Sequence, residues 1–225
     1  MNNPFSVIIR CKNEERWLGH TIQSVMDFIP NNEIIIVDNL SEDKSLEIAK
    51  SFRQDPDLNG NSEYYTDVSV IDVSSYTPGS AINLGVQSAK YPNILIISSH
   101  CVITKFNITA VMESLKTYAG IFGNQIPRYQ GKRIKKRYLW KHFGETLKED
   151  MYSDMEDRHF FHNAASLFTK ELLIKFPFNE NIVGKEDRYW ANHVIGAGEH
   201  TLYDPINFEV DHHYTANGNT WKGIG

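Results

Sequence analysis

The chain of 225 residues predicts one α/β domain built on a mostly parallel sheet. Two observations lead to this prediction. Short apolar runs rich in β-branched residues alternate with segments of helical periodicity along the first hundred residues. Polar residues follow these runs, and open α/β sheets bind ligands outside the carboxyl ends of their strands. The fold class therefore predicts where a ligand site should lie.

Four apolar runs before residue 100 have the length and composition of parallel strands covered on both faces. They are Val7–Arg10, Ile34–Val37, Val68–Val73 and Ile94–Ile97. Apolar residues recur at helical spacing between them, which predicts one helix in each connection. Ser41 is expected to cap the second of these helices, because its hydroxyl can accept from the free amides of the first turn.

The pattern changes after residue 100. The chain predicts a helix over Asn107–Tyr118, a strand over Gly120–Pro127, a short helix near Thr169–Phe176, a helix around Asp187 that ends at Gly198, and a final strand within Tyr203–Tyr214. Between residues 128 and 158 the sequence is polar and charged, and we expect an exposed excursion followed by a polar helix or mobile loop.

Composition narrows the function classes. With a net charge of -5 and a pI of about 6.0, the molecule as a whole has no electrostatic attraction for nucleic acid. No run approaches the roughly 20 apolar residues of a membrane span, and the first residues lack a signal-peptide pattern, so a cytoplasmic location is expected. Cys11 and Cys101 are too few for a disulfide framework and predict reduced thiols.

Six successive blocks carry a family resemblance: SVIIRCKNEERWLGHTIQSV, IIIVDNLSED, YTPGSAINLGVQSA, FFHNAASLF, PFNENIVGKEDRYWANHVIGAG and YDPINFEVDHH. In this order the chain resembles family 2 glycosyltransferases with the three-layer GT-A fold. The resemblance implies a single domain over residues 1–225, with 1–105 binding a nucleotide sugar and 106–225 holding the acceptor and the catalytic groups. It also implies an inverting transfer of sugar to a glycan or lipid-linked acceptor, in the synthesis of a surface polysaccharide or related glycoconjugate.

Residues at the ends of the early strands are expected on the donor side. They are Arg10, Lys12, Asn13, Asp38, Asn83, Ser98 and His100. Asp38 follows the second strand, where its carboxylate could accept from a nucleobase imide or a ribose hydroxyl. The alternative is that Asp38 is a capping acid in its own turn. A long cation at a loop, such as Lys12, is more often solvated.

The sharpest departure from the family lies at Ser98, Ser99 and His100, where relatives commonly carry Asp-x-Asp and hold a divalent cation. Without these carboxylates magnesium loses affinity, whereas an imidazole suits manganese or a softer ion. One hypothesis is that His100 and His212 ligate a metal. Another is that cations such as Lys12, Arg128 or the 132–137 cluster neutralise the diphosphate. A third is that His100 only forms hydrogen bonds.

Glu186 and Asp187 are the catalytic candidates. An inverting transfer needs a carboxylate to take the proton of the attacking hydroxyl. The resemblance implies that Asp187 is this base and that Glu186 lies near the acceptor. The alternative is two acids at a helix N-terminus, which the helix dipole favours in any protein. Asn163 and Trp190 are expected near the acceptor, although core packing is the more common role of a tryptophan.

A basic segment, residues 128–141, interrupts an otherwise acidic chain. Its cations could meet anionic lipid headgroups or a diphosphate-lipid acceptor, which would place the protein at the inner face of the membrane. Its aromatic residues Tyr129, Tyr138 and Trp140, with Leu139, would suit an interface. The alternative is a solvated loop. The cations are Arg128, Lys132, Arg133, Lys135, Lys136, Arg137 and Lys141.

Two other function classes remain open. A sugar nucleotidyltransferase would need a glycine-rich phosphate loop after the first strand, and CKNEERW contains no glycine. A catalytically silent relative that binds a nucleotide sugar or a partner protein is the stronger rival, because the Asp-x-Asp is missing. The retained Glu186, Asp187 and His212 argue against it.

Overall fold

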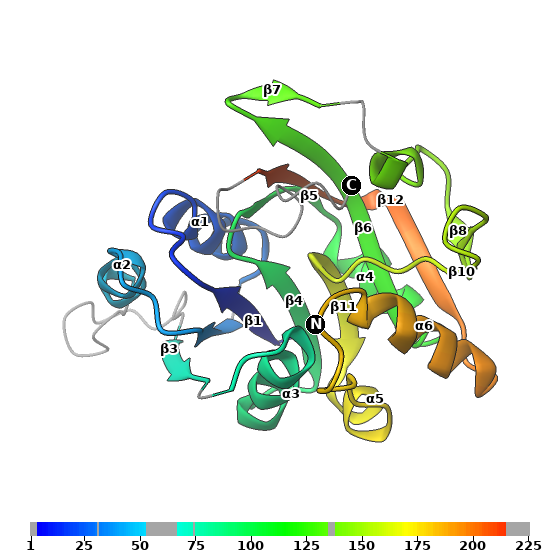
Figure 1. Cartoon of the computed structure of the whole chain (residues 1–225), viewed down its shortest axis with the longest axis horizontal. Coiled ribbons are helices and arrows are strands. Elements are labelled where there is room, and N and C mark those ends of the chain that lie inside the picture. The colour runs from blue at the N-terminus through cyan, green and yellow to red at the C-terminus, as the bar shows by residue number, and fades with distance from the viewer. Residues whose placement is uncertain (1–3, 31, 53–66, 74, 135–137, 215–225) are drawn as a thin grey trace.

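The computed structural model describes residues 4–30, 32–52, 67–73, 75–134 and 138–214. Its centre is one mixed sheet (Figure 1). The principal strands are β1 (Phe5–Cys11), β2 (Asn32–Asp38), β3 (Asp67–Asp72), β4 (Asn93–Ser98), β5 (Cys101–Phe106), β6 (Gly120–Tyr129), β11 (Ala165–Thr169) and β12 (Thr201–His213). They lie in the order β3-β2-β1-β4-β11-β6-β12-β5. The first four strands run parallel, β6 and β12 also pair in parallel, and β11 and β5 are antiparallel to their neighbours.

Helices cover both faces of the sheet. The bounds are α1 (Leu18–Phe28), α2 (Ser45–Ser51), α3 (Pro78–Ser88), α4 (Ile108–Ser114), α5 (Lys170–Lys175) and α6 (Glu186–Gly196). Side chains alternate along each strand, so Ile8 of β1 packs with the residues of α3, α5 and α6, whereas Val7 and Ile9 pack with those of α1, α2 and α4. The predicted three-layer α/β arrangement is thereby confirmed.

The cap predicted at Ser41 is wrong. The residue before α2 is Lys44, and no side chain caps that helix. Ser41 instead turns back to the end of β2, where its hydroxyl donates to Asp38 Oδ1 at 2.6 Å and its backbone N–H donates to Asp38 Oδ2 at 2.7 Å. The same hydroxyl accepts from the backbone N–H of Asn13 at 2.9 Å, so it serves the ends of β1 and β2 and not the helix.

The second half departs most from expectation. No strand was predicted at β5, where only Cys101 and Ile103 are buried and the exposed residues are Thr104 and Lys105. The expected helix or loop before residue 158 contains a 3-10 turn, η2 (Tyr138–Lys141), and short strands instead. These strands are β7 (Lys132–Arg133), β8 (Lys148–Glu149), β9 (Tyr152–Ser153) and β10 (Arg158–His159). Strand β7 pairs with β6, β8 with β12, and β9 with β10. A strand of two residues is too short to show the alternation of apolar and polar residues by which strands are predicted from sequence.

Strand β12 brings the end of the described chain to the first half of the molecule. It pairs with β6 on one side and with β5 on the other. The N–H of His213 donates to the carbonyl of His100 at 2.9 Å, and the ring of His213 stacks on Trp17 with ring centres 3.6 Å apart. His212 and His100 thereby lie next to each other although 112 positions separate them in the sequence.

We expect Gly85→Ala to lower the free energy of unfolding by about 1–3 kcal/mol. Helix α3 lies so close to β1 that a Cβ on Gly85 would be 2.6 Å from Ile8 Cγ2, in a buried contact with no room to relax. Gly196→Ala is the matched control, because a Cβ there would meet no atom within 4 Å. Denaturant unfolding of both variants tests this, and equal stabilities would contradict it.

Candidate active site

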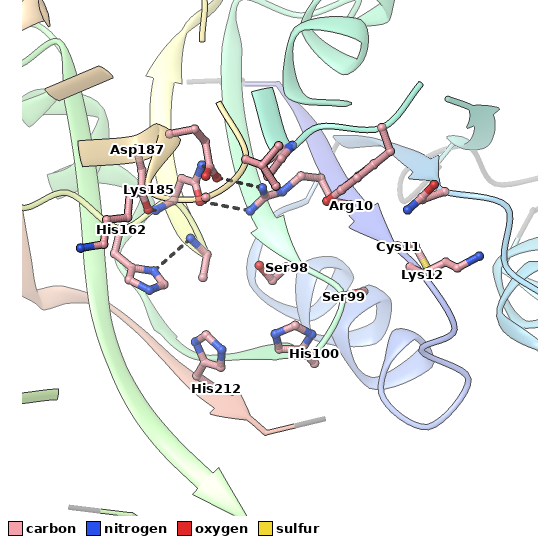
Figure 2. A pocket seen from close by; sticks show the side chains of 18 of the residues that line it. Arg10, Cys11, Lys12, Ser98, Ser99, His100, His162, Lys185, Asp187 and His212 are labelled. Atoms are coloured by element: carbon pink, nitrogen blue, oxygen red, sulfur yellow. Dashed lines mark hydrogen bonds and ion pairs between the residues drawn. The ribbon is translucent and has the colours of Figure 1, made fainter. Parts of the chain in front are cut away.

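A cavity of about 600 Å³ opens at the carboxyl ends of β1 and β4. Its walls come from the end of β1, the turn after β4, the segment before β11, the start of α6 and the end of β12. Figure 2 shows Arg10 and Asp187 on one side, His100 and His212 on the other, and Ser98 and Ser99 between them. This is the position at which open α/β sheets bind ligands.

The acidic wall is formed by Glu186 in the first turn of α6. Its Oε1 accepts from Arg10 Nη1 at 3.2 Å and from Asn163 Nδ2 at 3.1 Å. Arg10 Nη2 also donates to Asn163 Oδ1 at 3.1 Å, which closes a ring of three side chains. Burial opposes the charge of Arg10, but nearby Tyr76, Glu186 and Asp187 outweigh this and raise its pKa. The guanidinium therefore stays charged and joins β1 to α6.

Asp187 is buried and fully engaged. Its Oδ1 accepts from the backbone N–H and the Nη1 of Arg188, and its Oδ2 accepts from Arg188 Nη1 and from the N–H of Asn163, all between 2.8 and 3.1 Å. A carboxylate has about four acceptor positions, and these four contacts occupy them. Glu186 differs, because no hydrogen bond to its Oε2 is found in the described part of the chain.

Further charges hold the start of α6. Lys185 adopts left-handed backbone geometry with φ of 59° at the N-cap, and its Nζ lies 3.0 Å from Glu156 Oε2. Glu156 Oε1 lies 3.9 Å from Nε of Arg188, whose guanidinium packs 4.5 Å from the ring centre of Phe160. Glu156 and Arg188 are the buried members, and removal of one partner of a buried pair leaves an uncompensated charge that destabilises a protein by about 3–5 kcal/mol.

The opposite wall carries histidines. His100 Nδ1 lies 3.0 Å from Glu14 Oε1, and His212 Nδ1 lies 2.9 Å from Gln125 Oε1, while the two rings are 5.0 Å apart. His162 also lines the cavity. Burial first, and then the cations Arg188 and Arg10, hold the pKa of His162 well below its ordinary value. Burial and the neighbouring histidines do the same to the pKa of His212, so both rings are neutral.

Three of the predicted donor residues lie outside the cavity lining. Asp38 is fully buried, with both oxygens held by Ser41. Asn13 has φ of 52°, and its Oδ1 accepts from the N–H of Glu42. Asn83 joins α3 to the segment before α6 through both backbone groups of Phe178. In this structure each of the three supports a loop.

The other predicted donor residues do line the cavity: Arg10, Lys12, Ser98 and His100. The ammonium of Lys12 donates to the carbonyl of Leu40 at the rim. Ser98 is nearly buried at the end of β4, and its short hydroxyl brings no charge. Arg10, Lys12 and His100 of the predicted donor set thus line the cavity, and the Ser98 position brings no carboxylate to it.

On the acceptor side, only one of the two predicted residues lines the cavity. Asn163 does so and contacts both acids. Trp190 lies in the core, where its ring stacks on Phe178 and its Nε1 donates to the carbonyl of Phe176 at 2.8 Å. The alternative of core packing therefore describes Trp190 in this structure.

The basic segment 128–141 is anchored at its end. Leu139 and Trp140, expected at an interface, are buried instead, and Trp140 Nε1 donates to the hydroxyl of Tyr214. Arg128 pairs with Asp211 at 2.9 Å. Lys132 and Arg133 are exposed on β7, whereas Lys135, Lys136 and Arg137 lie outside the described residues. None of the described helices is long and apolar enough to cross a membrane.

Sequence reasoning did not select Gln125 or Arg188, and it gave no site role to Glu14. Arg188 follows Asp187 directly, so adjacency was an available signal. No signal in the sequence points to Gln125, because it lies within β6 and its surroundings depend on pairing with β12, far along the chain. Burial raises the pKa of the Cys11 thiol to about 12, and burial raises that of Cys101 as well, which keeps both thiols unreactive.

A second group of possible metal ligands lies away from the cavity lining. Glu149, Asp150 and His200 approach one another near β8 and the start of β12. Asp150 already accepts from the N–H of Thr201 at 2.8 Å and contacts His200 Nδ1 at 2.6 Å. Internal hydrogen bonds thus account for this exposed group.

Comparison with known proteins gives a family match and structural neighbours. The model of glycosyl transferase family 2 matches residues 6–176. No curated protein matches the chain. Among solved structures, S. aureus TarS 1-349 in complex with UDP-GlcNAc has a TM-score of 0.70 at 16% identity, covering 98% of this chain and 61% of that one. GalNAc-T7 with UDP, GalNAc and Mn²⁺ has a TM-score of 0.66 at 15% identity, covering 95% and 44%. These likenesses confirm the predicted GT-A fold. The chain spans about three fifths of the TarS structure that it matches.

Proposed function

Because the chain belongs to glycosyl transferase family 2, we propose that it is an inverting transferase that moves a sugar from a nucleotide-sugar donor to a glycan or lipid-linked acceptor. The observation that carries the proposal is the cavity itself. Two buried acids face histidines across a space of about 600 Å³, at the carboxyl ends of β1 and β4. TarS and GalNAc-T7, which share the fold, are described with UDP-GlcNAc and UDP, so UDP sugars are the first donors to test.

In the proposed reaction the acceptor hydroxyl attacks the anomeric carbon from the face opposite the diphosphate. The new carbon–oxygen bond forms as the bond to the diphosphate breaks, and Asp187 takes the hydroxyl proton. Asp187 must give up one contact with Arg188 or Asn163 to do so, because its acceptor positions are engaged. Glu186 can hold a second acceptor hydroxyl through Oε2, which supports its role in acceptor binding.

Charge builds on the diphosphate as it leaves. Lys12 and Arg10 line the cavity and can stabilise this charge, although Arg10 already pairs with Glu186. A divalent ion is the other source of positive charge. His212 supports this choice, because its Nε2 is buried and has no hydrogen-bond partner among the described residues. His100 and His212 would hold the ion, and their nitrogen ligands fit manganese or a softer metal better than magnesium. When bound, the ion would neutralise diphosphate charge.

The acceptor, pathway and location are further parts of the proposal. We propose a role in surface polysaccharide or glycoconjugate synthesis, on the cytoplasmic side of the membrane. The exposed Lys132 and Arg133 support contact with anionic lipid, which cosedimentation with anionic vesicles would test. The buried Leu139 and Trp140 give no support to an apolar membrane contact.

A thermal-shift screen with UDP, dTDP, GDP and CMP, each with EDTA or manganese, tests the donor site. A ligand that binds the native state raises the melting temperature by mass action. We expect UDP or its sugar conjugates to give the largest shift. Transfer to a glycan acceptor then separates an active enzyme from a silent binding module. Absence of any shift, or binding without transfer to any acceptor, would contradict the proposed activity.

A further inference from the structure

Two cavity histidines are joined by one buried side-chain amide. Gln125 of β6 is 1% exposed, and its Nε2 lies 3.0 Å from His162 Nδ1 while its Oε1 lies 2.9 Å from His212 Nδ1. An amide donates only from its nitrogen and accepts only at its oxygen. The two neutral imidazoles therefore cannot present the same tautomer to Gln125. One Nδ1 accepts a hydrogen bond, and the other carries a hydrogen and donates it.

A backbone amide determines which of the two histidines accepts at Nδ1 and which donates from it. The N–H of Ala164 points at His162 Nδ1 over 3.4 Å. A backbone N–H can only donate and, unlike a glutamine amide, cannot be turned around. His162 Nδ1 is thus the acceptor, and the hydrogen of this ring lies on Nε2. Gln125 then turns its NH₂ group to His162 and its oxygen to His212. Consequently His212 carries its hydrogen on Nδ1 and has a bare Nε2.

The ring of His212 lies beside the ring of His100, with the two ring centres 5.0 Å apart. Within the described residues His212 Nε2 is buried without a hydrogen-bond partner. His100 Nδ1 faces the carboxylate of Glu14 at 3.0 Å, so the tautomer that donates from Nδ1 to this carboxylate leaves Nε2 bare. A metal–nitrogen bond of about 2.1 Å puts each ring centre roughly 3.2 Å from an ion, so two rings at ~90–110° have centres about 4.5–5.2 Å apart. The observed separation of 5.0 Å fits this arrangement.

We propose that Gln125 is a positioning residue that fixes His162 and His212 in opposite tautomers. His212 thereby offers Nε2 to a divalent transition-metal ion next to His100, with Gln125 and Glu14 as the partners that orient the two rings. His162 offers its Nε2–H to an oxygen of the bound diphosphate. The role of His162 rests on the proposed function, whereas the tautomers and the metal site do not.

The tautomers can be read directly by long-range ¹H–¹⁵N correlation NMR of the imidazoles without any ligand. We expect the hydrogen on Nε2 in His162 and on Nδ1 in His212, with single replacements of each assigning the signals. Gln125→Met keeps the approximate shape and removes both hydrogen bonds of Gln125, so His212 should lose its single tautomer, whereas the N–H of Ala164 still favours the hydrogen on Nε2 in His162. Should this variant fail to fold, Gln125→Glu serves instead. Its carboxylate only accepts, and a charge-assisted hydrogen bond outweighs the long 3.4 Å contact with Ala164, so the hydrogen of His162 should move to Nδ1. The same tautomer on both rings of the wild-type protein would overturn the proposal.

Metal binding gives a second readout. Titration of the protein alone with Mn²⁺, followed by electron paramagnetic resonance, should show an affinity about 10–100-fold lower in Gln125→Met than in wild type. Gln23→Met on the exposed face of α1 and His200→Gln outside the cavity lining are the controls and should bind as wild type. Unchanged tautomers and unchanged Mn²⁺ affinity in Gln125→Met would refute the positioning role.

The role of His162 has its own variant. His162→Phe should weaken UDP binding by about 2–10-fold, the effect of one neutral hydrogen bond, while Mn²⁺ affinity without nucleotide stays at the wild-type value. Unchanged UDP affinity would reject diphosphate contact by His162. If no nucleotide binds the wild-type protein while the tautomers and Mn²⁺ affinity are as expected, the proposed function fails and the inference about Gln125 and His212 stands.

Discussion

Asp187→Asn is expected to slow sugar transfer by about 10²–10⁴-fold and to leave nucleotide affinity within about twofold of wild type. Asparagine has nearly the shape of aspartate, but it cannot take the proton of the attacking hydroxyl. The nucleotide does not depend on that step, so its affinity reports whether the cavity is intact. Single-turnover transfer rates and calorimetric nucleotide titration together measure both quantities.

Asp187 also has structural contacts, so a loss of stability in Asp187→Asn must be separated from a loss of proton transfer. Its carboxylate accepts two charge-assisted hydrogen bonds from Arg188, so the amide of the variant loses part of this pairing. Some loss of stability is expected, and thermal unfolding of the variant measures it. If the rate and the nucleotide affinity fall by the same factor, Asp187 has a structural role and the base lies elsewhere.

Glu186→Gln is the matched comparison, since both acids lie in the first turn of α6 and both line the cavity. Glutamine can still accept from Arg10 and Asn163 through its oxygen. We expect the variant to raise the KM for the acceptor while it changes kcat less than Asp187→Asn does. The reverse order of the two effects on kcat would assign the proton transfer to Glu186, whose Oε2 already makes no hydrogen bond within the described residues.

The sequence predicted those parts of the site that follow from local rules. Parallel strands end at one edge of a sheet, so Arg10 and Ser98 had to lie close together once β1 and β4 were recognised as neighbours. The acids at the start of α6 were expected at the site from the family resemblance, while the helix dipole explains only why negative charge is stable there.

The residues that could not be placed depend on partners far along the chain. Asn83 is held by Phe178, 95 positions away, and Gln125 reaches His212 across 87 positions. A polar residue gives no sign in sequence of whether its partner is a ligand or another loop. For Asp38 the local alternative, a cap within its own turn, describes the structure because Ser41 lies three residues away.

Removal of divalent metal is expected to weaken donor binding by at least about 10-fold, and manganese is expected to restore it better than magnesium. The reason is the ligand set. The Ser98 position supplies no carboxylate, and the two candidate ligands, His100 and His212, offer imidazole nitrogens. Magnesium needs oxygen ligands in near-octahedral geometry, whereas manganese accepts nitrogen. Calorimetric titration with the UDP sugar in EDTA, in Mn²⁺ and in Mg²⁺ tests the order of affinities.

His212→Gln separates the metal from the other cations of the cavity. This variant should bind donor equally weakly with EDTA and with manganese, because the bare Nε2 is gone. Indifference of the wild-type protein to EDTA would instead assign charge neutralisation to side chains. Arg128 is a poor candidate for that role, because it already pairs with Asp211 and does not line the cavity. Lys12 and Lys185 do line it, so Lys12→Ala would then be the variant that loses donor affinity, and its loss would increase as salt is lowered, because screening is weaker.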